Sequence, residues 1–161
     1  MTNVTDPHLP QGCEAHRGTL LHFLEDPGNE PKPAAGSVAL FEDGLLILHQ
    51  GKVLVAGDAN EWLNRLPEST PVTHWKDQLI LPGFIDTHVH MPQLGVMASY
   101  GAQLLDWLET YTFPHEARFS DIDWARAEAS RFTDLLLRYG TTSGLVFCTS
   151  HSESVHGLFE A

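Results

Sequence analysis

From Leu79 onward, short apolar runs alternate with longer stretches that have helical periodicity. The runs 79–90 and 141–148 are apolar enough for buried strands, and apolar residues three and four positions apart follow each of them. Strand, helix, strand and helix in this order are typical of a parallel α/β sheet, because parallel strands need a crossover connection. The pattern therefore predicts that residues 79–161 form a parallel α/β structure.

Capping and helix-breaking residues set the expected ends of the helices. A helix is predicted over 103–111, and Pro114 is expected to end it because proline lacks the N–H that a helix needs. Ser120 is expected to cap a longer second helix, and Gly140 to terminate it. Ser152 is expected to cap a third helix after the second strand.

Residues 1–78 have a different pattern and are expected to form a small, β-sandwich-like N-terminal segment, part of a composite β domain. Three short apolar runs are separated by Asp43-Gly44 and Gln50-Gly51, which predict the turns of a β-meander. A short helix is expected over 59–66 and a further strand over 70–76. We therefore expect two domains, residues 1–78 and residues 79–161.

Composition excludes several classes of protein. Nine Lys and Arg face 21 Asp and Glu, so the formal net charge is −12, which disfavours binding to nucleic acid polymers and anionic membranes. Cys13 and Cys148 are too far apart in sequence for a Cys-x-x-Cys pair. The first residues lack the features of a signal peptide, and no apolar run is long enough to span a bilayer. A cytoplasmic protein is expected.

The candidate site lies in the stretch PGFIDTHVH, where alternation along a strand places Asp86, His88 and His90 on one face. Two imidazoles on one strand face can bind the same metal ion, and catalytic groups of parallel barrels lie at the carboxyl ends of strands. His88 and His90 are therefore predicted to be metal ligands, with Asp86 orienting them through hydrogen bonds. A His-x-His pair without such surroundings is more often simple packing.

PGFIDTHVH resembles the signature of the amidohydrolase superfamily, metal-dependent hydrolases built on a (β/α)8 TIM barrel. Within that superfamily, Gln93 together with LLDWLETYTFP (104–114) and RYGTTSGLVF (138–147) is similar to the guanine deaminases. The resemblance implies one zinc ion, or iron, bound by His88 and His90. It also implies that Gln93 hydrogen-bonds the purine, that Trp107 lines the guanine pocket, and that water converts guanine to xanthine and ammonia in a homodimeric enzyme of purine catabolism.

The sequence leaves alternatives open. Trp107 has helical spacing with apolar neighbours, which core packing explains equally well. The substrate of another superfamily member could be a triazine or pyrimidine, and a chain without enzymatic activity could be an interaction module. A whole barrel takes roughly 250 residues, so residues 84–161 suffice for about two strand–helix units. The chain is therefore expected to be truncated and inactive alone, with the remaining metal ligands and the general acid/base beyond Ala161.

Overall fold

The computed structural model describes residues 9–161, which form two compact units. The first unit ends at Pro82, and the second spans Gly83–Ala161. Each unit has its own group of buried apolar side chains. The polypeptide therefore builds two separate cores.

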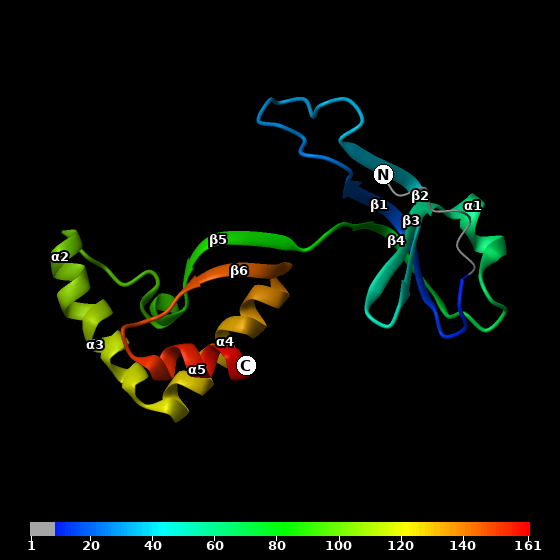
Figure 1. Cartoon of the computed structure of the whole chain (residues 1–161). Coiled ribbons are helices and arrows are strands. Elements are labelled where there is room, and N and C mark those ends of the chain that lie inside the picture. The colour runs from blue at the N-terminus through cyan, green and yellow to red at the C-terminus, as the bar shows by residue number, and fades with distance from the viewer. Residues whose placement is uncertain (1–8) are drawn as a thin grey trace. The chain divides into compact units, whose positions relative to one another are not determined.

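The first unit is a four-stranded sheet with the strand order β3-β2-β1-β4 (Figure 1). Strand β2 (Val38–His49) pairs antiparallel with both β1 (Glu14–Phe23) and β3 (Lys52–Asp58). Strand β4 (Val72–Ile80) pairs parallel with β1. Helix α1 (Ala59–Trp62) and a 3₁₀ turn follow β3. Their apolar side chains pack on a core that contains Leu9, Cys13, Ala15, Leu45, Ile47, Val55 and Ala59.

One of the two turns expected in this sheet is confirmed. Gln50 and Gly51 have φ values of 50° and 73°, as a tight hairpin with two left-handed central residues requires. The other prediction is wrong, because β2 runs straight through Asp43-Gly44. Gly44 instead allows close contact with β1, since an added Cβ would lie 2.4 Å from the Leu20 side chain. Asp43 accepts two hydrogen bonds of 2.7 Å from Arg17, which lower the pKa of its carboxyl group.

The second unit begins with the expected parallel strands, β5 (Phe84–His90) and β6 (Thr141–Phe147). Helix α4 (Ile122–Arg138) crosses over between them, and α5 (Ser152–Glu160) follows β6. Figure 1 shows α4 and α5 together on one side of the strand pair. The predicted order of strand, helix, strand and helix is therefore confirmed.

The segment between β5 and α4 differs from the prediction. The chain forms a 3₁₀ segment (Met91–Val96), α2 (Leu104–Trp107), a π-helical turn (Leu108–Thr112) and α3 (Phe113–Glu116). Pro114 does not end the helix, because it lies in the first turn of α3, where its missing N–H removes no helical hydrogen bond. The preceding turn is widened, with the Phe113 N–H donating to the Leu108 carbonyl five residues earlier.

Two predicted helix caps are also wrong. Asp121, not Ser120, caps α4 by accepting hydrogen bonds from the backbone of Asp123 and Trp124. Ser152 is the first residue of α5, and no side chain caps this helix. The expected end of α4 is confirmed, because Gly140 adopts a φ of 81° just after the helix.

The core of the second unit lies between its helices and strands. Its buried members are Met91, Phe119, Ala125, Ala129 and Phe132.

No helix formed by residues 9–161 combines the length and apolar character that crossing a bilayer requires.

Candidate active site

The two histidines of β5 converge as the strand alternation predicts. The Nε2 atoms of His88 and His90 lie 3.1 Å apart, and the ring centroids are 5.2 Å apart. His88 is exposed and His90 is half-buried. Both rings therefore present one nitrogen to the same point at the carboxyl end of β5.

Phe147 fixes the rings from the neighbouring strand. Its ring centroid lies 4.6 Å from that of His88 and 4.8 Å from that of His90, with the His90 ring stacked. Phe147 is the register partner of His90 at the end of β6. Sequence reasoning gave this residue no role, although its place at the end of the adjacent parallel strand was an available signal.

Asp86 acts on the backbone of the same strand. Its Oδ1 accepts a hydrogen bond of 3.0 Å from the backbone N–H of His88. This bond restrains the segment between Asp86 and His88, as expected for a residue that orients the histidines. The Asp86 carboxylate thus restrains the β5 backbone at His88, and the Phe147 ring of β6 contacts both imidazoles.

The Nε2 atoms of His88 and His90 lie within hydrogen-bond distance of each other, and imidazole nitrogens are also donors that zinc accepts. In a tetrahedral zinc site with Zn–N bonds of about 2.0–2.1 Å, two ligand nitrogens lie roughly 3.3 Å apart. The separation of 3.1 Å between the His88 and His90 nitrogens is close to this value. Within residues 9–161, no group of three or more His, Cys, Asp or Glu side chains could hold a metal ion. The described residues therefore offer two matched imidazole ligands and not a complete coordination shell.

The structure places Gln93 and Trp107 in different surroundings. Gln93 follows β5 in the 3₁₀ segment, is half-buried, and donates from Nε2 to Oε1 of Glu116 at 3.3 Å. Trp107 ends α2 and packs closely on Gly101, where an added Cβ would lie 2.6 Å from the Trp107 Cβ. Gln93 is therefore tied to α3, whereas Trp107 contacts its own connecting loop.

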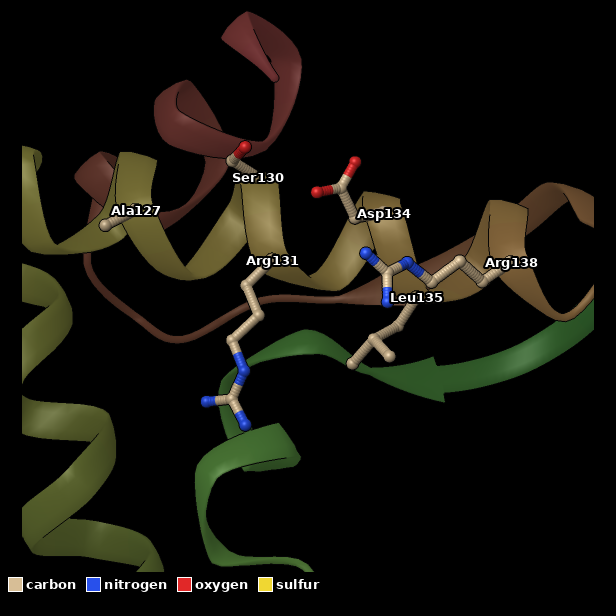
Figure 2. A pocket seen from close by; sticks show the side chains of 6 residues that line it. All are labelled: Ala127, Ser130, Arg131, Asp134, Leu135 and Arg138. Carbon is tan, nitrogen blue, oxygen red and sulfur yellow. The ribbon is translucent and has the colours of Figure 1, made fainter.

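A hollow of about 450 Å³ runs along α4 (Figure 2). Every residue that lines it belongs to α4, so it is a groove on one helix and not the candidate metal site. The lining residues are Ala127, Ser130, Arg131, Asp134, Leu135 and Arg138.

Residues 79–161, which contain β5, β6 and the histidine pair, match the Amidohydrolase family. This chain belongs to the amidohydrolase family. The matched region holds the two converging imidazoles at a strand end. The amidohydrolase chain is 42% identical to guanine deaminase of Escherichia coli (strain K12) over 148 residues. That match covers 92% of this chain and 34% of the relative.

Solved structures of guanine deaminases have the same mixed α/β fold as this amidohydrolase. The enzyme from Bradyrhizobium japonicum superposes with a TM-score of 0.82 at 35% identity, over 92% of this chain and 32% of that one. The enzyme from C. acetobutylicum, solved with guanine bound in its active site, gives a TM-score of 0.70 at 27% identity, over 92% and 33% of the two chains. The amidohydrolase chain thus spans about a third of the length of the relatives it matches.

Proposed function

We propose that the protein containing these residues is a guanine deaminase, which hydrolyses guanine to xanthine and ammonia. The observation that carries the proposal is the convergence of His88 and His90, with nitrogens 3.1 Å apart, at the carboxyl end of a parallel strand in an amidohydrolase. Guanine deaminases are its relatives both in sequence and in structure, which supports guanine as the substrate.

His88 and His90 would hold a zinc ion, with iron as the other candidate metal, because both metals accept imidazole nitrogen. When bound, such a metal lowers the pKa of water toward about 7 and would supply the nucleophile for hydrolysis of the bond between ring carbon C2 and its exocyclic amino group, which leaves as ammonia. The contribution of this chain is to hold the two ligands rigidly. Phe147 contacts both rings, and Asp86 Oδ1 accepts a hydrogen bond from the backbone N–H of His88.

Gln93 and Trp107 would bind the purine. A carboxamide both donates and accepts hydrogen bonds, so Gln93 can match a ring edge that carries a donor beside an acceptor. Trp107 is half-buried and would offer an aromatic surface to the flat base. Neither residue transfers a proton in this proposal.

The other properties that we propose follow from this activity and from composition. The enzyme would act on the free base in purine catabolism, in the cytoplasm and as a homodimer. A net charge of −12 disfavours a nucleic acid polymer or an anionic membrane as its partner.

The complete product of the gene that encodes this chain provides the direct test of the activity. Incubated with zinc and guanine, it should release xanthine and ammonia in equal amounts, as ultraviolet absorbance and an ammonia assay would measure. A zinc-loaded, folded protein that forms no xanthine contradicts the proposal. Turnover of a triazine or pyrimidine in its place would assign the other substrate class.

Substitution of the histidines tests the metal site. His88→Ala and His90→Ala should each reduce bound metal and guanine turnover to background, because each removes one of only two ligands on β5. Metal content is measured by atomic emission after dialysis. His156→Ala, which changes an exposed histidine on α5, is the matched control and should retain its metal. If the double variant His88→Ala/His90→Ala kept stoichiometric metal, the assignment would be wrong.

A further inference from the structure

Gln93 has a charged partner that the proposed function leaves unexplained. Its Nε2 donates to Oε1 of Glu116 at 3.3 Å, and both side chains are half-buried. The two residues are 23 positions apart and belong to separate elements, the 3₁₀ segment after β5 and helix α3. The bond is therefore a tertiary contact and not a product of local sequence.

The chemistry of the partner decides which way the Gln93 carboxamide faces. An amide can exchange its oxygen and nitrogen by rotating about its last torsion, and a neutral partner such as a hydroxyl accepts either orientation. An ionised carboxylate only accepts hydrogen bonds, so Glu116 requires the nitrogen of Gln93 to face it. This leaves the Gln93 oxygen and one N–H free for another partner, a donor and an acceptor in one plane.

Helix α3 brings Glu116 to this position because the chain remains helical through Pro114. The π-helical turn Leu108–Thr112 precedes α3, and Glu116 is the last residue of α3. The neighbouring His115 packs edge-on against Phe119 and Trp124, at centroid distances of 6.1 and 6.0 Å. Aromatic packing therefore holds the helix turn that carries the carboxylate.

Glu116 also borders a hollow of about 170 Å³ at the carboxyl end of β6. The opposite wall is the loop 149–151, which follows that strand. Because β5 and β6 are parallel, this end of the pair is also the end that carries His90. The hollow beside Glu116 thus lies at the same end of the strand pair as the histidines.

We infer that Glu116 is a positioning residue that holds the Gln93 carboxamide in the one orientation suited to a purine edge. The inference rests on the proposed function, since it assigns the free donor and acceptor of Gln93 to guanine. Glu116 itself does not touch the substrate in this arrangement. Its effect on turnover should therefore pass entirely through Gln93.

A double-mutant cycle in the complete, zinc-loaded gene product tests this dependence. Glu116→Ala should lower kcat/KM for guanine by roughly three- to tenfold, the equivalent of one hydrogen bond. In the Gln93→Ala background the same change should lower kcat/KM by less than about twofold, because no amide remains to be oriented. Glu116→Gln keeps the size of the side chain and should give an intermediate loss, since a carboxamide partner permits both orientations of Gln93.

Three further measurements separate positioning from a general loss of structure. Metal content and the unfolding midpoint should stay unchanged in the Glu116 variants, and Glu109→Ala, at an exposed acidic residue in the π-helical turn, should retain full activity. If the double variant lost kcat/KM by the product of the two single losses, the inference would be overturned, because Glu116 would then act independently of Gln93. An unsubstituted protein without guanine turnover overturns the proposed function and, with it, this role for the pair.

Discussion

Asp121 supplies the side-chain cap of α4 and is the residue on which the start of that helix depends. Its Oδ1 accepts from the N–H groups of Asp123 and Trp124 at 2.9 and 3.3 Å. The neighbouring Ser120 instead donates to the Ala117 carbonyl at 2.9 Å. Sequence alone could not separate these two adjacent residues, because serine and aspartate are equally good caps.

Alanine substitution distinguishes the two residues experimentally. Asp121→Ala should lower the free energy of unfolding by about 1 kcal/mol, because two helix N–H groups lose their acceptor and a negative charge leaves the positive end of the helix. Ser120→Ala is the matched control and should lower the free energy of unfolding clearly less. Urea unfolding of the complete gene product measures both. Equal losses, or a larger loss from Ser120→Ala, would contradict the cap assignment.

Cys148 carries a thiol whose ionisation is suppressed by the fold. Burial raises the pKa of this thiol above its ordinary value of 9.0, and the side chain of Ser154 opposes part of the effect. Because the folded-state pKa is the higher one, the neutral thiol stabilises the folded protein below about pH 9. That contribution is lost as the pH rises through the folded-state pKa.

Cys148 should therefore be less reactive in the folded protein than in the unfolded protein. At pH 8 to 9, iodoacetamide should modify Cys148 more slowly in the folded protein than in urea, since only the thiolate attacks. Peptide mass spectrometry resolves this site from Cys13, which is also a free cysteine but fully buried. Faster modification of Cys148 in the folded state would show that its pKa is lowered.

At the scale of elements, α4 and α5 contact each other at Gly157. A Cβ added there would lie 2.8 Å from the Ala125 carbonyl carbon and 3.0 Å from the Arg126 nitrogen, both backbone atoms of α4. Backbone cannot move aside as a flexible side chain can. Arg126 also pairs with Glu160 near the end of α5, where Nε and Oε2 are 2.5 Å apart. The glycine therefore sets the distance between the helices.

Gly157→Ala tests this close contact through the sign of its effect. In the interior of an unconstrained helix, the change from glycine to alanine should raise the free energy of unfolding by up to about 1 kcal/mol. In α5 we expect the free energy of unfolding to fall by about 1–3 kcal/mol, because the added methyl group forces the helices apart. Denaturant unfolding measures the change, with Val155→Ala at a more exposed site on α5 as the control. A stabilised Gly157→Ala protein would show that the helices are not in close contact.

The connection between β5 and α4 shows where sequence patterns fail at this scale. Pro114 predicted a helix end, yet the chain remains helical through it because Pro114 lies in the first turn of α3, directly after the π-helical turn. Helical periodicity assumes 3.6 residues per turn and cannot reveal one wider turn. As a result, Glu116 was not recognised as the partner of Gln93.

At the scale of the whole molecule, apolar side chains remain exposed on the two-stranded sheet. Ile85 is 72% exposed, Leu145 60% and Phe84 56%. A pair of strands leaves unpaired backbone groups at its edges, and such edges together with exposed apolar surface favour association. The sheet of the second unit is thus poorly covered by residues 83–161.

The 161-residue polypeptide produced alone should therefore self-associate and lack guanine turnover. Sedimentation velocity should show oligomers or aggregates, and calorimetry should show a weak or absent cooperative transition. Replacing Ile85 and Leu145 by threonine should reduce the association, because both side chains are solvent-exposed in the second unit. A monomer with a sharp thermal transition would contradict this prediction.

Features that depend on neighbouring positions could be predicted from the sequence alone. Alternation on a strand placed His88 and His90 on one face, the order of strands and helices gave the parallel pair, and Gly140 marked the end of α4. These features are local, because they follow from the period of a strand or from the dihedral angles of one residue. The motif PGFIDTHVH was sufficient to predict the family.

Contacts between positions far apart in the sequence could be assigned only from the folded chain. The stacking of Phe147 on His90, the bond from Gln93 to Glu116 and the close contact at Gly157 each join separate elements. Such contacts depend on the register and packing of whole elements, to which many residues contribute small energies that no single position reveals. The convergence of His88 and His90 could therefore be predicted from the sequence, whereas the contacts of Phe147 with both rings and of Gln93 with Glu116 could not.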